Sequence, residues 1–444
     1  MMAYSVGQSA GSLRFVAEER GSKIPERLLG KLWKEKAARQ TGLRTEAGKR
    51  VRVVYPGRSG AAAGPDFRDA LLEVEGVGLV RGDVELHIRQ KDWDSHGHGS
   101  DPNYNGVVLH GALEVDSEQT RLHSGVQAPL VDLSVLLEKE SDDELAPNRG
   151  QLDLWDILAR KGFARPGSLD EAAETLGRAG DARFLIKSNW LVECIRDQGP
   201  EQALYQALME GLGYSSNRRQ FIELACRAPY QTIVKAAGEL PQEDRFDAIC
   251  GWLGSCSGLV EPDLPRPKGI GPAMNTGEWR LFRVRPANHP RRRVMGAALI
   301  LDRFLERGLA LGLAEVVGGS NPAKLIKALC AVSTDGSVLI GPGRALIGLG
   351  RALIGPGRAK DLAVNAVLPF MYGWGEISGQ GSGPALGLSD AALAVFQRFP
   401  LLTDNELTRE MKEQLLPAEW RGVVTNARRQ QGLLHLSALL KGAY

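Results

Sequence analysis

The architecture of the N-terminal part of the chain follows from Gly82-Asp83-Val84-Glu85-Leu86-His87, which lies inside an alternating run from residue 78 to 88. Apolar and polar residues that alternate with a period of two predict a β-strand with two chemically different faces. One face carries Val84 and Leu86, and the other carries Asp83, Glu85 and His87. Three ionisable groups on one strand face need partners, water or a metal ion, because burying them unpaired is costly.

Other β-patterns and one helical pattern surround this strand. The apolar or alternating runs are 51–55, 70–75 and 107–115, and a helix is expected from Pro25, with Glu26 in its first turn. If 70–75 and 78–88 form a hairpin, Asp66 reaches the face that carries Glu85. Carboxylates that meet in this way repel each other unless a cation lies between them, and Mg²⁺ or Mn²⁺ favours oxygen ligands. Asp66, Glu85 and Asp83 are therefore candidate ligands.

The segment after the strand adds further ionisable groups. It runs Asp92-Trp93-Asp94-Ser95-His96-Gly97-His98-Gly99-Ser100-Asp101. Two histidines one residue apart, on a glycine-rich loop, can bind zinc together with His87, and Asp101 is a possible additional ligand. A polar surface turn and an exposed sheet face with solvated charges are the alternative interpretations.

The size and composition of the chain indicate a globular protein of more than one domain. The 444 residues exceed what one hydrophobic core supports, and 43% hydrophobic and 24% charged residues are typical of soluble proteins. A net charge of +2 does not by itself indicate a nucleic-acid-binding protein. The five cysteines are scattered, and the sequence contains neither a signal-peptide pattern nor an uninterrupted apolar run long enough to cross a membrane. We therefore expect a cytoplasmic protein with reduced thiols and no membrane segment.

The pattern along the chain predicts an α+β protein in two domains. Residues 1–23 are expected to be a flexible tail, 24–145 a small mixed β-sheet domain, and 150–444 a larger all-α domain, because apolar residues recur at three- and four-residue spacing from about residue 151. Residues 339–359 read LIGPGRA, LIGLGRA and LIGPGRA. Glycine and proline exclude a coiled coil, so we interpret this repeat as an inert loop insertion.

A basic segment lies in the helical half. It contains Arg280, Arg283, Arg285, Arg291, Arg292 and Arg293 and no acidic residue after Glu278. Guanidinium groups match phosphates, so the segment is a candidate nucleic-acid contact, and solvated arginines before a helix are the alternative. The motifs GxxxxGK[ST], GxSxG and HExxH are absent from the sequence, so nothing indicates a P-loop ATPase, an α/β-hydrolase or a zincin.

Several segments resemble a bacterial family of unknown function, DUF2851. They are GPDF, GDVELH, DW, HGH and the D-x-x-Y-x-x-V-x-L-H pattern, followed by RPANHP and NARRQQGLLHL, and they extend from Glu26 to about His435. The family name implies no activity.

The order of the N-terminal elements resembles the PD-(D/E)XK nuclease core. That resemblance implies that Asp66 and Glu85 hold Mg²⁺ or Mn²⁺, that Glu26 is an auxiliary ligand, and that His87 stands where the family has a catalytic lysine. We therefore expect metal-dependent hydrolysis of nucleic acid, in which His87 or a histidine of the HGH loop accepts a proton. The alternatives are a binding or scaffold protein that retains an eroded nuclease-like site, and a zinc-binding protein that uses His87, His96 and His98.

Overall fold

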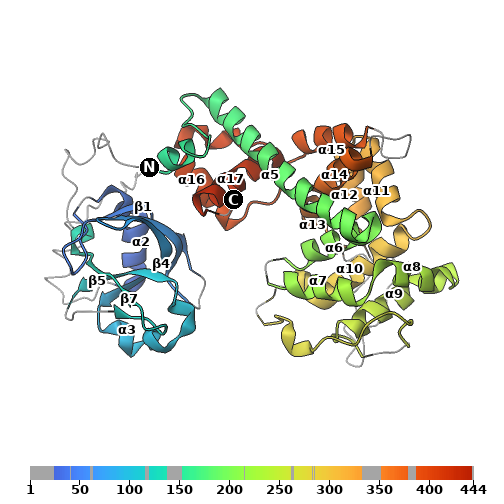
Figure 1. The fold of residues 1–444 in the computed structure, drawn as a ribbon, viewed down its shortest axis with the longest axis horizontal. Helices are drawn as coiled ribbons and strands as arrows, with labels where there is room; N and C mark the ends of the chain where they lie inside the picture. Colours follow the sequence, from blue (N-terminus) through green and yellow to red (C-terminus); the bar gives the residue numbers. More distant parts are fainter. Residues whose placement is uncertain are drawn as a thin grey trace, which may run out of the picture. The chain divides into compact units, whose positions relative to one another are not determined.

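The structure is a computed structural model that describes residues 25–40, 42–60, 64–115, 120–137, 153–214, 216–261, 265–282, 284, 286–332, 352–378 and 387–442. These form two compact units (Figure 1). The first unit comprises 1–165, 413–415 and 436–444, and the second comprises 166–412 and 416–435. One unit contains a mixed sheet and the other is mainly helical, which confirms the predicted α+β class. The predicted tail lies outside the described residues.

The first unit is built on one mixed sheet with the strand order β1-β3-β4-β5-β8. The strands are β1 (Val51–Tyr55), β3 (Phe67–Val74), β4 (Gly78–Arg89), β5 (Val107–Glu114) and β8 (Leu130–Asp132), and β2 (Arg58–Ser59) pairs with β3. β1, β3 and β4 are antiparallel, whereas β5 is parallel to both β4 and β8. The predicted hairpin of β3 and β4 is therefore confirmed.

Two hydrophobic cores hold this sheet in place. Helix α2 (Glu26–Lys36) packs its buried Leu29 and Trp33 against the sheet, where the ring of Trp33 lies 6.4 Å from that of Phe67. A smaller core of Trp93, Tyr104, Val107, Leu122 and Ala128 lies beneath the segment that follows β4. That segment contains the short helix α3 (Asp92–Ser95), and the hairpin β6 (Thr120–Arg121) and β7 (Gln127–Ala128) comes after β5.

The first unit also contains C-terminal residues, whereas the sequence pattern placed all residues from 150 onward in one helical domain. Lys441 and Arg81 both pair with Asp69, and the indole N–H of Trp155, in helix α4 (Leu154–Ala159), donates to the carbonyl of Leu415 at 3.1 Å. Asp69 has a left-handed φ of 61° at a bulge in β3, where its carboxylate also meets Arg58. These contacts explain why the C-terminal residues group with the sheet.

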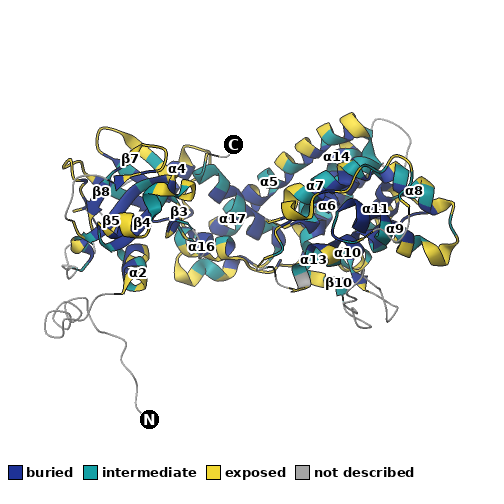
Figure 2. Cartoon of the chain, turned by 90° about the horizontal axis from the view of Figure 1, so that it is seen from below, coloured by how far each residue is buried: buried dark blue, intermediate teal, exposed yellow. Residues whose placement is uncertain are grey.

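The second unit is formed by helices whose buried faces point inward and whose exposed faces point outward (Figure 2). Its helices are α5 (Leu169–Gln198), α6 (Pro200–Leu212), α7 (Arg218–Arg227), α8 (Tyr230–Gly238), α9 (Gln242–Cys256), α10 (Pro290–Arg303), α11 (Leu309–Gly318), α12 (Pro322–Leu329), α13 (Pro356–Leu362), α14 (Leu368–Ser378) and α15 (Leu388–Gln397), while α16 (Glu406–Leu415) and α17 (Ala427–Leu440) extend into both units. Gly308, with φ +84°, separates α10 from α11. Among the described residues, no helix combines the length and apolarity needed to cross a membrane.

The third LIGPGRA copy is not the loop that we expected. Ala352–Ile354 forms strand β10, which pairs with β9 (Ala331–Val332), and Pro356 begins α13. Leu353, Ile354 and Ala359 are fully buried. Proline suits the first turn of a helix, so the glycine–proline pair ends the strand and starts the helix. The first two copies lie outside the described residues, apart from Ala352.

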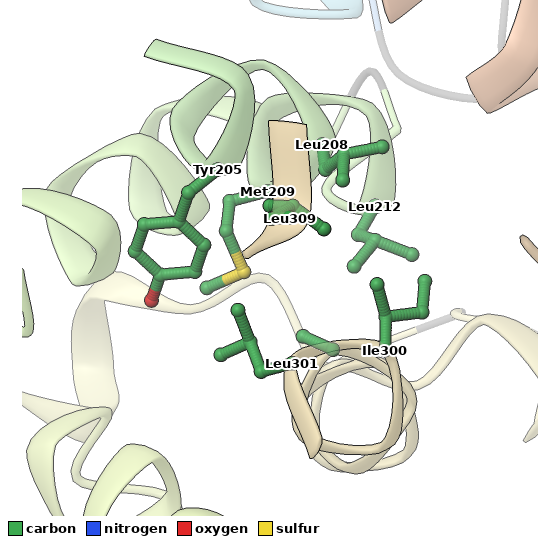
Figure 3. Close-up of a pocket in the computed structure, with 8 residues that line it drawn as sticks. Tyr205, Leu208, Met209, Leu212, Ile300, Leu301 and Leu309 are labelled. Carbon is green, nitrogen blue, oxygen red and sulfur yellow. The ribbon is translucent and has the colours of Figure 1, made fainter. Parts of the chain in front are cut away.

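An apolar cavity in the second unit carries no sign of a ligand site. Its lining consists of Tyr205, Leu208, Met209, Leu212, Ala297, Ile300, Leu301 and Leu309 (Figure 3). The hydroxyl of Tyr205 is buried without a hydrogen-bond partner. A cavity with an almost wholly apolar lining does not retain water, so we interpret it as a packing defect.

Candidate metal centre

Two hydrogen bonds between carboxylates and backbone N–H groups connect Asp66, in the loop before β3, with β4, which carries Glu85. The backbone N–H of Asp66 donates to Glu85 Oε2 at 2.8 Å, and the N–H of Leu86 donates to Asp66 Oδ2 at 3.1 Å. Glu85 is only 5% exposed. The hairpin thus brings together the two carboxylates that the sequence predicted to meet.

The two carboxylates and Glu26 repel one another. Burial raises the pKa of Glu85 to about 8, and the charges of Asp66 and Glu26 contribute to the rise. Burial of its carboxylate also raises the pKa of Asp66, with a further contribution from Glu26. Glu26 lies at the exposed N-terminus of α2 and is close enough to act on both. A cation placed among these groups would relieve the repulsion.

Asp83 does not join this carboxylate group, which corrects the expectation that it is a ligand beside Glu85. Its Oδ1 accepts the backbone N–H of Asp69 at 3.1 Å, at the bulge of β3. Burial raises its pKa, and the bond from the N–H of Asp69 and the charges of Arg68 and Arg58 oppose part of that rise. Its carboxylate is therefore used to hold the bulge.

Three histidines meet on the other side of Glu85. His87, His96 and His98 each offer a ring nitrogen, and these nitrogens lie within 4.8 Å of one another. Glu85 Oε1 is 3.2 Å from His98 Nε2 and 3.9 Å from His87 Nε2. His87 is buried, His98 is partly buried and His96 is exposed. Glu85 is therefore shared between a carboxylate pair and a histidine cluster.

A chain of hydrogen bonds fixes the ring of His87. Its Nδ1 is 2.9 Å from His110 Nε2, and His110 Nδ1 is 2.6 Å from the hydroxyl of Thr120. All three residues are buried. This leaves the Nε2 of His87 directed toward Glu85 and His98. A ring held through its other nitrogen is the usual arrangement for a metal-ligating histidine.

Burial keeps these imidazoles neutral. It lowers the pKa of His87 to about 3, with further lowering from His110 and the two loop histidines, and it lowers the pKa of His110 to about 4. Burial also lowers the pKa of His98. A neutral imidazole has a lone pair for a metal ion, whereas a buried histidine with so low a pKa is a weak general base.

Local structure holds the loop histidines. Gly97 has a φ of +75°, so the chain reverses between His96 and His98, and their rings lie 5.5 Å apart. The ring of His98 stacks on Tyr104 at 4.0 Å, and Trp93 donates from its indole N–H to the carbonyl of Arg121 at 3.2 Å.

Asp101 has a structural role beside this loop. Its side chain accepts the N–H of Asn103 at 2.9 Å and caps the 3₁₀ turn at 102–104. Asp101 therefore stabilises the loop, whereas the sequence analysis considered it a possible additional ligand.

The donor set fits a divalent metal ion. Imidazole nitrogens suit Zn²⁺ and Mn²⁺, and carboxylate oxygens suit Mg²⁺ and Mn²⁺. His87, His96, His98 and Glu85 would supply one mixed set, and Asp66 would add an oxygen beside it. Within the described residues, this histidine trio is the cluster whose ligand atoms converge closely enough to hold an ion.

The basic segment of the second unit is only partly available to a ligand from solvent. Arg280 and Arg291 are exposed, whereas Arg283 and Arg285 lie outside the described residues. Arg292 and Arg293 donate to the carbonyls of Ala352 and Leu353, and Arg293 is only 4% exposed. Arg293 is therefore turned inward, with its Nη1 bonded to β10, and its contact with a nucleic-acid backbone stays a prediction.

Sequence reasoning did not predict three parts of the site. The bonding of His110 to His87, the role of Thr120 and the stacking of Tyr104 on His98 depend on how β5 and its hairpin pack on β4. The only signal in the sequence was the placement of His110 among apolar residues of a strand, which indicated a buried histidine.

The comparisons with known proteins identify a family but no activity. A family model described as a protein of unknown function (DUF2851) matches residues 26–257, which is more than half of the chain. The match covers the whole candidate centre. No significant match to a curated protein or to a solved structure is found.

Proposed function

The chain belongs to the DUF2851 family of proteins of unknown function, and we propose that it is a divalent-metal-dependent hydrolase that cleaves phosphodiester bonds in nucleic acid. The observation that carries the proposal is the position of Glu85, between Asp66 on one side and the histidine cluster on the other.

The donor set favours Mn²⁺ or Zn²⁺ over Mg²⁺, because it combines imidazole nitrogens with carboxylate oxygens. Glu85, His87 and His98 would hold the ion, with Asp66 as a further oxygen ligand and Glu26 as an auxiliary acid. A bound divalent ion polarises a phosphate and lowers the pKa of a coordinated water.

The residues of the chain have distinct tasks in this proposal. The bonds from Thr120 through His110 keep His87 in one orientation, so that its Nε2 stays available as a ligand. His96 is exposed and is therefore the histidine best placed to take a proton from the attacking water. This revises the role that the sequence suggested for His87, from proton acceptor to ligand.

The substrate class rests on the order of the elements. Helix α2 with Glu26, strand β1, Asp66 before β3, and Glu85 and His87 on β4 follow the order that the resemblance to the PD-(D/E)XK core implies. The exposed Arg280 and Arg291 are proposed contacts to the nucleic-acid backbone.

A second candidate function is zinc binding without catalysis. The convergence of His87, His96 and His98 favours it, because three imidazoles and a carboxylate suit a four-coordinate zinc site. The two candidates differ in the need for Asp66, which a zinc site made from the histidines and Glu85 does not require.

Cleavage of labelled single- and double-stranded DNA and RNA with Mn²⁺, Mg²⁺ or Zn²⁺ tests the proposal. We expect metal-dependent cleavage by the wild type and a loss of at least a hundredfold in Asp66→Ala and in Glu85→Ala. Asp94→Ala, an exposed acid in the same segment, is the matched control and should retain activity. Metal binding without cleavage in the wild type would favour the zinc-binding alternative, and cleavage that survives Glu85→Ala would refute the proposed site.

A further inference from the structure

The second unit contains a buried pair of arginines where two features of the sequence meet. Arg293 comes from the basic segment and Arg358 from the third LIGPGRA copy. Their guanidinium carbons lie 5.4 Å and 2.9 Å from the centre of the same ring, that of Tyr214. Arg293 is 4% exposed, and the side chain of Arg358 is 8% exposed.

Part of the hydrogen-bonding capacity of this pair is unused. Arg358 donates from Nη1 to the carbonyl of Gly211 at 3.2 Å, but its Nε and Nη2 are buried without a partner. The Nε of Arg293 is also buried without a partner. Nearly all buried donors in native proteins are satisfied, and leaving one unpaired costs about 1–3 kcal/mol. Three such donors in one place indicate a missing acceptor.

The geometry of the unused donors matches an oxyanion. Nε and Nη2 lie on one edge of the planar guanidinium group, where their N–H bonds run side by side. This is the edge that binds two oxygens of a phosphate or a carboxylate. The face of the Arg358 group is covered by the ring of Tyr214, so the edge is the part that remains for a ligand.

Positive charge exceeds negative charge around the pair. Among the described residues, one carboxylate faces it, that of Asp361, whose Oδ2 is 3.5 Å from Arg358 Nη1. Burial lowers the pKa of Arg293 and of Arg358 to about 10, so both remain charged at neutral pH. Burial lowers the pKa of Lys187 well below its usual range, so the excess charge comes from the two arginines. Lys187 donates to Asn365, which belongs to a π-helical turn at 363–367. Such turns occur frequently at functional sites.

Tyr214 separates this pair from solvent. It is 37% exposed and has a left-handed φ of 54°, which is strained for a residue with a side chain. Strained backbone of this kind persists where the surroundings hold it and is common at ligand clamps. A rotation of the ring away from the face of Arg358 would open a path from solvent to the buried pair and its unused edge.

We propose that Arg293 and Arg358 form a binding site for a phosphate-type oxyanion inside the second unit, closed by Tyr214. The bidentate edge of Arg358 takes two oxygens, and the Nε of Arg293 takes a third. The excess of positive charge favours a phosphate group over a singly charged carboxylate. The site is independent of the metal centre and of the proposed hydrolase activity.

Calorimetric titration of the full chain with inorganic phosphate, and separately with acetate, tests this proposal. We expect one phosphate per chain in the wild type and at least tenfold weaker binding of acetate. Arg358→Lys keeps a positive charge but loses the fork and should weaken phosphate binding at least tenfold. Arg219→Lys, at an exposed arginine in the first turn of α7, is the matched control and should bind as the wild type does.

Tyr214→Ala keeps the proposal testable if Arg358→Lys fails to fold. It removes the ring that covers both guanidinium groups and the hydroxyl that accepts from Arg293 Nη2 at 3.4 Å, so phosphate should still bind and should bind faster. An absence of phosphate binding in the wild type, equal binding in Arg358→Lys, or a preference for acetate would each overturn the proposal.

Discussion

Glu85 should make the metal-free protein lose stability as the pH rises. Its pKa is raised from 4.5 to about 8 in the folded chain, mainly by burial and then by the charge of Asp66. The folded state therefore binds more protons than the unfolded state between these two values, and the free energy of unfolding falls across that window. Each pKa unit corresponds to about 1.4 kcal/mol, so the loss is at most roughly 5 kcal/mol.

Glu85→Gln should remove this dependence. Glutamine keeps an oxygen that accepts the N–H of Asp66 but carries no charge, so the variant should be more stable than the wild type at pH 8 and similar to it at pH 5. The assay is urea unfolding in a chelator from pH 5 to 8, read from pulsed hydrogen exchange of β4.

The control for this experiment is Glu35→Gln, an exposed acid on α2. It should follow the wild type at every pH. A stability that falls equally with pH in the wild type and in Glu85→Gln would refute the reasoning, because the lost stability would then have another source.

Three further perturbations follow from named contacts. Gly97→Ala should weaken metal binding at least tenfold in a titration, since a left-handed φ of +75° costs a side chain about 1–2 kcal/mol. Gly162→Ala, with φ +87° in the turn after α4, should leave metal affinity unchanged, and equal loss in both would argue against the loop geometry. Asp69→Asn should lower the free energy of unfolding by about 1–3 kcal/mol at pH 7, because it removes the charge that faces three cations. These cations lower the pKa of the wild-type carboxylate, so the deficit should shrink as the pH falls and that carboxylate becomes protonated. A deficit that does not change with pH would contradict this. Tyr205→Phe should leave stability unchanged or raise it by up to about 1 kcal/mol in urea unfolding, because the buried hydroxyl has no partner, and a clear loss would show that it has one.

Local patterns predicted most elements of the fold, because each is a short segment with its own periodicity. The alternation around Glu85 predicted β4, and the apolar face of α2 predicted the helix that covers the sheet. Contacts between residues far apart in the sequence determined the features of the fold that local patterns did not predict. Lys441 pairs with Asp69 although the two residues lie near opposite ends of the chain. The third LIGPGRA copy forms part of a strand and a helix because β10 pairs with β9 and accepts a hydrogen bond from α10.

The candidate site was partly predictable for the same reason. A hairpin of β3 and β4 follows from their patterns, so the meeting of Asp66 and Glu85 could be expected. The position of Asp83 could not, because a bulge in β3 turns the N–H of Asp69 toward it. The bond between His87 and His110 depends on the register of two parallel strands, which sequence patterns do not specify.

The most direct test of the central claim is the metal content of the chain after loading with Zn²⁺ or Mn²⁺ and dialysis, measured by mass spectrometry on wild type, His98→Ala and His123→Ala. His98 belongs to the cluster, whereas His123 is exposed and outside it. A metal centre at Glu85 predicts one ion per chain in the wild type and in His123→Ala, and a loss of the ion in His98→Ala. A wild type that retains no ion, or a His98→Ala variant that retains it fully, would contradict the account.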